Sequence, residues 1–445
     1  PMMTHLFENT TGNLIVATKG APEAIIAVSK LTPSEIKILQ ETILNLGKEG
    51  YRLLAVGNGI FTGMEYPKQQ QDFKFEFKGI IAFYDPPKEN IPQVLKNFES
   101  AGIHVKLVTG DNANTAIAIA KQINFKGFEK CISGDELMQL TDAELQEKVK
   151  DINVYSRMFP DAKLRIVNAL KKNNEVVAMT GDGVNDGPAL KASHIGIAMG
   201  KKGTEIAKQA ASLILVDDDL SKMVDAIAMG RKIYTNLKKA IQYIISIHIP
   251  IILTVFIPLA LRWVYPNVFS PSHVILLELI MGPTCSIIFE NEPMEKNLML
   301  KKPRPFSTTF FNYKELFTSI IQGLIITLGA LSVYQYSVIN VFSESVTRTM
   351  VFMVLIFANI FLTLVNRSFY YSIFTTLNYK NSLVPLIIGI TLTLSLLLLY
   401  IPAFTHFFEF ESLSIDQLGI SLLVGGFSVL WYESVKWVKR SKNKN

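Results

Sequence analysis

The pattern of apolar and polar residues changes character at about residue 239 of this 445-residue chain. Before that point, short apolar runs alternate with helical periodicity, as in a soluble domain. After it, six longer apolar runs are each close to the roughly 20 residues that a helix needs to cross a bilayer. These predicted spans are residues 241–261, 274–289, 316–338, 350–365, 383–403 and 418–435. The sequence therefore predicts a soluble N-terminal half followed by an all-α membrane domain of six helices.

The soluble half contains two patterns. Residues 13–18 and 52–56 are predicted strands, and residues 33–49 between them have the apolar spacing of a helix. From residue 78 onward, strand and helix patterns alternate, which is typical of a parallel sheet with helices on both faces. The first pattern therefore indicates a small α+β region and the second an α/β domain.

Polar motifs follow two of the predicted parallel strands. Thr109-Gly110-Asp111 comes directly after the strand at 103–108, and Asp182 follows the strand at 175–179. Ligands of open parallel sheets bind beyond the carboxyl ends of the strands. We therefore expect these side chains to converge on one phosphate, although they are far apart in the sequence.

Lys163 is expected to face the same place. It follows Pro160 by three residues and begins a helix whose apolar positions include Ile166, Val167 and Leu170. An ammonium fixed beside phosphoryl oxygens offsets developing negative charge, an effect of about 3 kcal/mol for a preorganised donor.

Residues 179–190 (MTGDGVNDGPAL) place two carboxylates and an amide in a glycine-rich turn. Glycine lets the backbone approach an anion closely, and Asp182, Asn185 and Asp186 offer hard oxygen atoms to a divalent metal. A lone Gly-Asp-Gly is an ordinary turn, whereas all twelve residues together resemble the hinge motif of the P-type cation-transporting ATPases.

Other motifs carry the same resemblance in the same order along the chain. They are Lys19-Gly20-Ala21-Pro22-Glu23, Asp85-Pro86-Pro87-Lys88 with Lys in place of the family's Arg, Thr109-Gly110-Asp111, and the spaced Arg157, Pro160 and Lys163. The resemblance implies a partial α+β nucleotide-binding domain at 1–77 and a haloacid-dehalogenase-like (Rossmann-like) α/β phosphorylation domain at 78–232. It also implies a transmembrane domain with six helices at 233–445.

The resemblance further implies Mg²⁺ and ATP as cofactors and assigns roles to residues. Asp182 would bind the metal with support from Asp186, whereas Asp111 would either bind nucleotide or close its turn. The implied catalytic residues are Lys163, Thr109, Gly110, Asp111 and Asn185. The implied nucleotide-binding residues are Lys19, Arg52, Thr109, Gly110, Asp111, Arg157, Lys163 and Asn185. For Arg52, a solvated strand-end cation is an equal alternative.

Two family motifs are missing from the printed sequence. Neither Asp-Lys-Thr-Gly-Thr, whose aspartate accepts the phosphoryl group, nor the actuator motif Thr-Gly-Glu-Ser occurs. The chain is therefore expected to be a C-terminal part of a pump that does not form the phosphoenzyme by itself. Two alternatives stay open: a catalytically inactive pseudo-pump or membrane subunit, and a membrane-tethered haloacid-dehalogenase-type phosphatase, although no suitable Asp-x-Asp nucleophile is visible.

The candidate transport site lies in the first two spans. Glu278 stands in an apolar run, where an ionisable group costs about 2.5–3.5 kcal/mol at a helix centre and is a functional candidate; a snorkelling carboxylate is the alternative. His248 and Pro250 are expected to break helical hydrogen bonding near mid-membrane, and Thr284 to add an oxygen ligand.

The sequence departs from two-site calcium pumps at two aligned positions. Ile251 stands where those pumps have a glutamate, and Gly282 where they have an aspartate. Calcium takes six to eight oxygen ligands, so one site at most is expected, with calcium as the first candidate ion. Cys285, a single thiol, is a weak sign of a soft-metal site and is expected to be a packing residue.

Charge and cysteine content narrow the setting. The net charge is +6, but Lys and Arg form no stripe with interleaved aromatics, so no nucleic-acid partner is expected. The two cysteines predict no disulfide framework. Basic residues fall in alternate connections between spans, which by the positive-inside rule puts both ends of the chain in the cytosol. We expect a monomeric multi-pass protein of the plasma (inner) membrane whose partners are ATP, a cation and the lipid bilayer.

Overall fold

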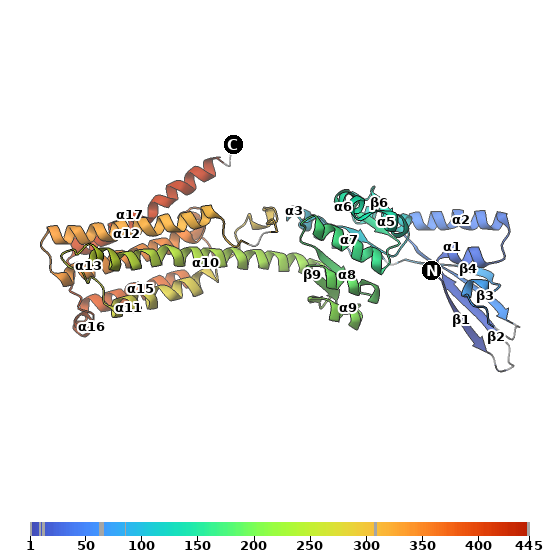
Figure 1. The fold of residues 1–445 in the computed structure, drawn as a ribbon, viewed down its shortest axis with the longest axis horizontal. Coiled ribbons are helices and arrows are strands. Elements are labelled where there is room, and N and C mark those ends of the chain that lie inside the picture. Colours follow the sequence, from blue (N-terminus) through green and yellow to red (C-terminus); the bar gives the residue numbers. More distant parts are fainter. Residues whose placement is uncertain are drawn as a thin grey trace. The chain divides into compact units, whose positions relative to one another are not determined.

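The computed structural model describes residues 2–8, 10, 14–61, 66–84, 86–306 and 309–442, apart from the side chains of residues 60, 285 and 286. The chain forms two compact units. The first comprises Pro1–Ala226 and Leu300–Phe306, and the second comprises Ile227–Met299 and Ser307–Asn445. Figure 1 shows their elements along the chain. The predicted strand start at residue 13, Asp85 of the Asp-Pro-Pro-Lys motif and the Cys285 side chain lie outside the described part.

The first unit begins with an antiparallel sheet of four strands in the order β1-β2-β3-β4. The strands are β1 (Met2–Glu8), β2 (Leu14–Gly20), β3 (Arg52–Phe61) and β4 (Glu76–Phe83). β3 is longer than predicted. The sequence pattern placed residues from 78 onward in the α/β domain. β4, however, pairs with β3 in the antiparallel sheet. A domain boundary at 77/78 would therefore divide β4.

Two helices accompany this sheet, α1 (Pro22–Val28) and α2 (Pro33–Lys48). The start of α2 is specified locally. The Glu35 side chain accepts a hydrogen bond from the backbone N–H of Thr32, whose hydroxyl oxygen accepts one from the backbone N–H of Glu35, and Pro33 has the φ angle that a first helical turn needs. The helix predicted at 33–49 is thereby confirmed to within one residue.

Parallel strands follow, as predicted, but the described strands form two sheets of three. One has the order β5-β7-β6 and the other β10-β9-β8. The strands are β5 (Leu107–Val108), β6 (Cys131–Ser133), β7 (Val154–Ser156), β8 (Ala178–Gly181), β9 (Ile195–Met199) and β10 (Leu213–Leu215). The helices between them are α3 (Ile91–Ser100), α4 (Ala113–Gln122), α5 (Gly134–Gln139), α6 (Asp142–Asp151), α7 (Pro160–Lys172), α8 (Gly187–Ala192) and α9 (Glu205–Ala210).

Each of these sheets has one open edge that matters for the site. Among the described residues, β5 pairs only with β7, and β8 pairs only with β9. These two strands carry the Thr-Gly-Asp and Gly-Asp-Gly motifs at their carboxyl ends. Both motif-bearing strands therefore retain free backbone N–H and C=O groups along one side.

The second unit contains the membrane helices. Within the described residues, six helices are long and apolar enough to cross a bilayer, which confirms the six predicted spans. They are α10 (Ser221–Ala260), α11 (Pro271–Pro283) with its π-helical continuation Thr284–Phe289, α12 (Tyr313–Ile339), α13 (Glu344–Asn366), α15 (Leu383–Tyr400) and α17 (Ile415–Lys442). Two short helices, α14 (Ile373–Leu377) and α16 (Pro402–Phe407), lie in the connections. α13 is the most buried span and forms the centre of the unit's apolar core.

The helical path of α10 continues through Pro250 and Pro258. Pro250 has no backbone N–H, so the C=O of Ser246 lacks its usual helical donor, and the predicted break in helical hydrogen bonding near His248 stays a prediction. Arg348 lies outside the predicted span at 350–365, but it is on α13 and is buried. The second span ends in a π-helical segment after Pro283.

Candidate functional site

The Gly-Asp-Gly loop after β8 is organised around the carboxylate of Asp186. One oxygen, Oδ2, accepts hydrogen bonds from the backbone N–H groups of Gly183 (3.1 Å) and Asp182 (3.3 Å). The other, Oδ1, accepts one from Nζ of Lys163 at 2.6 Å. A Cβ at Gly181 would stand 2.4 Å from Cβ of Asp186, so only glycine permits this approach. Asp186 therefore fixes the loop.

Lys163 and Asp186 form a nearly buried ion pair, with side chains only 12% and 8% exposed. Lys163 lies in the first turn of α7 and Asp186 immediately precedes α8. Burying a charge is costly unless it is paired and hydrogen-bonded, and both conditions are met here. The pair positions the loop that carries Asp182.

Asp182 has the opposite environment. Its residue is exposed, and its carboxylate makes no hydrogen bond or ion pair with any residue that the structure describes. Its backbone is held, because Asp182 C=O accepts from Thr204 N–H at 2.8 Å. No group of three or more His, Cys, Asp or Glu side chains within the described ranges could enclose a metal. A free carboxylate on a fixed backbone fits Mg²⁺, which keeps several waters and shares its ligands with phosphate groups.

The Thr109-Gly110-Asp111 turn after β5 is closed by its own side chains. Thr109 Oγ1 donates to the Asp111 carboxylate at 3.1 Å and accepts from the Asp111 N–H at 3.1 Å. The backbone N–H of Arg157 donates to Asp111 C=O at 2.8 Å. The turn is thus tied to the loop that follows β7, while Gly110 stays exposed with open space on its Cβ side.

The two strand-end loops are not joined directly. Across the described part of the chain, no hydrogen bond or ion pair connects Thr109 or Asp111 with Lys163, Asp182 or Asn185. Lys163 forms its ion pair with Asp186. It forms none with Asp111 or Asp182, the two aspartates expected to converge on one phosphate. The expected convergence on one phosphate therefore stays a prediction.

The predicted nucleotide-binding cations lie at the antiparallel sheet and beside it. Lys19 is exposed on β2. Arg52, at the start of β3, pairs through Nε with the Asp111 carboxylate at 3.4 Å. Arg157, which has a φ of 51°, pairs with Glu23 of α1 at 2.8 Å. Arg52 thereby contacts the motif that follows β5, and Arg157 contacts the motif that follows β2. Pairs formed by a solvent-exposed arginine contribute little to stability.

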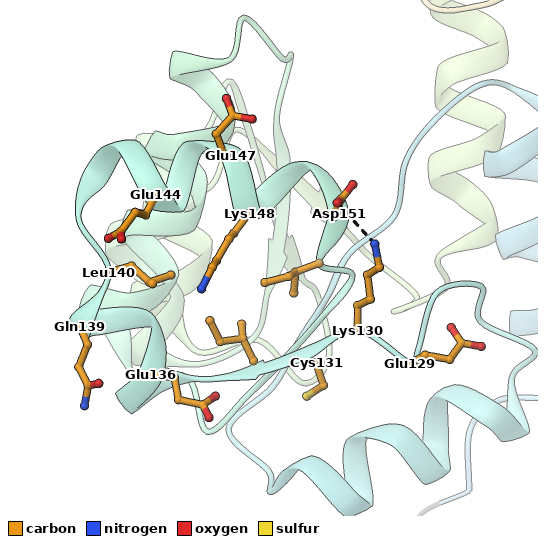
Figure 2. A pocket seen from close by; sticks show the side chains of 12 residues that line it. Glu129, Lys130, Cys131, Glu136, Gln139, Leu140, Glu144, Glu147, Lys148 and Asp151 are labelled. Atoms are coloured by element: carbon orange, nitrogen blue, oxygen red, sulfur yellow. Dashed lines mark ion pairs between the residues drawn. The ribbon is translucent and has the colours of Figure 1, made fainter.

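A surface hollow lies elsewhere in the first unit, between β6, α5 and α6 (Figure 2). Five of its twelve lining residues are acidic, and one of them, Asp151, forms an ion pair with Lys130 at 3.4 Å. The lining contains none of the predicted site residues. The hollow is therefore not the predicted phosphate site.

In the second unit, the structure brings together two of the three predicted transport residues. Nε2 of His248 on α10 lies 3.0 Å from Oε1 of Glu278 on α11, and the two side chains are 41% and 44% exposed. The other ring nitrogen, Nδ1, bonds the C=O of Ile244 at 2.8 Å. Thr284 is buried, and in the described part of the chain it makes no hydrogen bond to either residue.

Sequence reasoning missed a buried polar cluster in the second unit. Glu292 pairs with Arg367 at 2.9 Å and accepts from the Asn381 side chain at 2.9 Å. Lys239 on α10 pairs with Glu295 at 2.8 Å. Apart from Lys239, in the middle of α10, these residues lie in connections or near helix ends, and each looks like a solvated polar residue in sequence. The sequence signal for this cluster was the presence of three glutamates in Glu290-Asn291-Glu292-Pro293-Met294-Glu295, directly after a span.

Comparison with known proteins identifies two regions. Residues 21–194 match the family described as haloacid dehalogenase-like hydrolase, and residues 266–438 match the family described as cation transporting ATPase, C-terminus. The first match covers the Thr-Gly-Asp and Gly-Asp-Gly loops, and the second covers five of the six candidate spans. The predicted fold class, a haloacid-dehalogenase-like domain joined to six membrane helices, is confirmed.

Several curated relatives are similar over most of this chain. Calcium-transporting ATPase 1 of Saccharomyces cerevisiae is 29% identical over 100% of the chain and 48% of its own length. Calcium-transporting ATPase type 2C member 1 of Homo sapiens is 30% identical over 93% of the chain and 44% of its own length. The calcium-transporting ATPase of Bacillus subtilis is 33% identical over 74% and 38%. The chain spans about half the length of the relatives it matches, or less.

Proposed function

Because the chain belongs to the P-type cation-transporting ATPases and covers part of a calcium-pump-like member, we propose that it serves ATP-driven transport of a cation through an aspartyl-phosphate intermediate. The observation that carries this proposal is the loop after β8. There, the buried Lys163–Asp186 pair holds the free carboxylate of Asp182 on a fixed backbone. Such preorganisation suits phosphoryl transfer, where catalysis is mainly positioning and electrostatics.

Transport by this route requires an aspartate that accepts the phosphoryl group. No Asp-Lys-Thr-Gly-Thr occurs in the chain, and the motif-bearing strands β5 and β8 each have an unpaired edge in the described part. A parallel strand between them would satisfy both edges and join the two sheets. Its carboxyl end would then lie beside Thr109 and Asp182, where an acceptor aspartate is required. We assign the acceptor to pump sequence outside the printed residues.

Each site residue then has a defined task. The Lys163 ammonium offsets negative charge on the transferring group, and Thr109 and Asn185 donate hydrogen bonds to its oxygens. Asp182 would hold Mg²⁺, which neutralises phosphate charge when bound, and Asp186 orients Lys163 and the loop. Gly110 lets the backbone come close to the phosphate.

ATP would be held by cations of the first unit. Lys19, Arg52 and Arg157 suit phosphates and the adenine ring, because Lys is a compact charge and Arg a planar fork. In this structure Arg52 pairs with Asp111 and Arg157 with Glu23. The arginine side chains of these pairs are 79% and 47% exposed, so exchange of their partners for a nucleotide costs little.

Transport would take place at Glu278 with His248, and Thr284 would contribute an oxygen. Calcium is the first candidate, since the three relatives described above are named calcium-transporting ATPases. α10 runs as one helix from the first unit into the first span and is the proposed mechanical link. We propose a monomer in the plasma (inner) membrane, with both ends of the chain in the cytosol as basic-residue placement favours.

Phosphate incorporation tests this proposal and separates it from its alternatives. In the complete pump, radiolabelled γ-phosphate of ATP should be incorporated in a cation-dependent manner as an acyl phosphate that hydroxylamine cleaves. The 445-residue chain alone should incorporate none. Label on the chain alone would mean that it contains its own nucleophile, as a tethered phosphatase would. No label in the complete pump would indicate an inactive pseudo-pump.

A further inference from the structure

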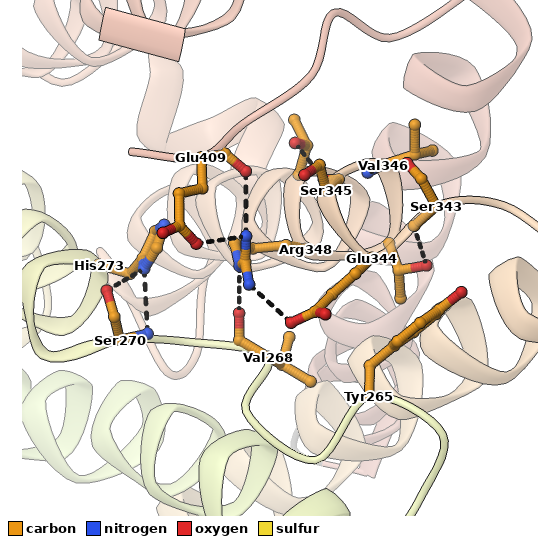
Figure 3. A network of polar contacts seen from close by, with 12 residues as sticks. Tyr265, Val268, Ser270, His273, Ser343, Glu344, Ser345, Val346, Arg348 and Glu409 are labelled. Carbon is orange, nitrogen blue, oxygen red and sulfur yellow. Dashed lines mark hydrogen bonds and ion pairs between the residues drawn. The ribbon is translucent and has the colours of Figure 1, made fainter. Parts of the chain in front are cut away.

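One end of the second unit is held together by two buried side chains, His273 and Arg348 (Figure 3). At this end lie the connections between α10 and α11, between α12 and α13, and between α15 and α17. The Arg348 guanidinium on α13 bonds Val268 C=O (2.8 Å), Glu409 C=O (3.1 Å) and the carboxylates of Glu344 (2.8 Å) and Glu409 (3.0 Å). We call Ser270, His273, Arg348, Phe408 and Glu409 the end latch.

His273 occupies a special position in the end latch. It is the third residue of α11, where a capping box usually has Glu or Gln. Nδ1 of the ring accepts from the backbone N–H of Ser270 at 3.1 Å, and Nε2 lies 2.6 Å from Phe408 C=O. One imidazole therefore caps α11 and also ties it to the 408–414 connection.

The partners of the ring fix its protonation state. The Ser270 N–H can only donate, so it needs an Nδ1 without a proton, and the Phe408 C=O can only accept, so Nε2 carries one. The Ser270 hydroxyl lies 2.7 Å from Nδ1 and can donate to it. Neutral imidazole therefore satisfies all three contacts. A second proton, on Nδ1, would remove the acceptor for Ser270 N–H and would place a cation at the positive N-terminal end of a helix.

The neighbouring charges also favour the neutral imidazole. Arg348 on α13 is permanently charged and opposes a second cation in the same buried region. Glu409 attracts a proton, but its carboxylate is exposed and already paired with Arg348, as is Glu344. His273 itself is only 1% exposed and is surrounded by Phe269, Phe408 and Phe410, so water cannot easily solvate the added charge.

We propose that His273 is a proton-sensitive switch: neutral, it caps α11 by accepting the Ser270 N–H, and protonated, it loses that cap while Nε2 still donates to Phe408 C=O. A Glu or Gln at this position would cap the helix without any response near neutral pH. Arg348 keeps Val268 and Glu409 in place at every pH, so the loss of the cap is local. Glu278 lies five residues beyond His273 on α11. If the proposed function holds, acidification at this end of the bundle would thus change the hold on the transport residue.

Amide hydrogen exchange in the 445-residue chain in lipid nanodiscs tests the switch without requiring transport. Exchange would be measured about one unit above and about two units below the ordinary imidazole pKa of about 6.5, because burial and Arg348 oppose protonation, and corrected for intrinsic rates. Protection of Ser270–Val274 should fall about tenfold on acidification, the factor that one lost helix cap represents. Phe410 and Glu411 should keep their protection, because Nε2 still donates to Phe408 C=O. His273→Gln, which has a donor and an acceptor but cannot ionise, should keep its protection at both pH values.

Two further variants complete the test. His406→Gln changes an exposed histidine in neighbouring α16 and should respond to pH like wild type. His273→Ala should be unprotected at both pH values. Equal pH responses in wild type and His273→Gln would overturn the proposal, as would a pH-independent wild type. Since neither outcome involves ATP or a cation, failure of the switch is distinguishable from failure of the proposed function.

Discussion

Two ion pairs, one in each unit, show how differently charge is used in this chain. Lys163–Asp186 in the first unit is nearly buried, and both Asp186 oxygens are satisfied by the ammonium and two backbone N–H groups. His248–Glu278 in the second unit is almost half exposed, and Glu278 has only the imidazole as a partner among the described side chains.

The difference indicates which pair is fixed and which is exchangeable. A buried pair that loses one partner leaves an uncompensated charge, so it behaves as a permanent part of the fold. A half-exposed pair loses little when one partner is replaced by a bound ion. On this reasoning the first pair positions a reactive loop, and the second is suited to exchange its imidazole for a cation.

The largest effect is expected from breaking the fixed pair. Lys163→Met should lower the free energy of unfolding of the first unit by about 3–5 kcal/mol, because the Asp186 carboxylate stays buried without its cation. Urea-dependent amide exchange of α7 and α8 in the whole chain would measure it. Lys208→Met, which removes the partner of the exposed Glu205, is the matched control and should cost under about 1 kcal/mol. Equal losses would show that Lys163 is not held as described.

Removing the free carboxylate should affect chemistry and leave stability unchanged. In the complete pump, Asp182→Asn should lower the ATP hydrolysis rate about 10²–10³-fold, the scale of losing one preorganised electrostatic contact. Folding should be unaffected, because the Asp182 side chain has no partner in the described structure. Rates measured over a range of Mg²⁺ concentrations would check this, with the exposed Asp72→Asn as control. A wild-type rate at every concentration would remove Asp182 from the metal site.

Changes to the exchangeable pair, His248–Glu278, should alter the apparent affinity for the cation. Glu278→Gln is expected to weaken cation stimulation of ATP hydrolysis about 10- to 100-fold in apparent affinity, since a hydrogen bond or contact to a charged group contributes about 1.5–3 kcal/mol. His248→Gln retains a donor toward Glu278 and should have a smaller effect. Glu290→Gln, an exposed acid just after the π-helical segment, is the control. Identical affinities in Glu278→Gln and wild type would exclude Glu278 from the transport site.

Sequence patterns were sufficient for much of the fold, for identifiable reasons. Six spans follow from hydrophobic length, and the start of α2 from Thr32-Pro33 and Glu35. The pattern did not show that β4 joins the antiparallel sheet, because apolar alternation does not specify a strand's partner. It also did not show that α10 continues through Pro250, because packing of the surrounding spans can keep a helix intact where local propensity would break it.

The candidate site was predictable in its residue types but not in its contacts. The glycine-rich motif selected Asp182 and Asp186, and the spacing after Pro160 selected Lys163. Only the structure shows that Lys163 bonds Asp186 and leaves Asp182 free. His273 was missed altogether. Its signal was Ser270-Pro271 followed by a residue at the third helical position, but the histidine there matches no usual capping box. Long-range partners such as Phe408 and Arg348 cannot be inferred from local sequence.

The smallest predicted effect uses an ordinary cap as the counterpart of the His273 cap. Glu144, in the first turn of α6, accepts hydrogen bonds from the Thr141 backbone N–H at 2.8 Å and from its hydroxyl at 2.8 Å. The backbone bond first, and then the hydroxyl bond, lower the pKa of Glu144 from its ordinary value of 4.5. A lowered carboxyl pKa stabilises the fold above pH 4.5, and this stability is lost as the pH falls through the folded-state value.

Protection of α6 amides in the whole chain should therefore stay constant from neutral pH down to about pH 5 and decline slightly below 4.5. Glu144→Gln keeps an acceptor for Thr141 and should abolish the decline. Because Glu144 is a charged cap and His273 a neutral one, α6 should still be protected at about pH 4.5, where α11 has lost its protection. A decline of both helices at the same pH would mean that acid acts on the fold as a whole, and the contrast between the two caps would be lost.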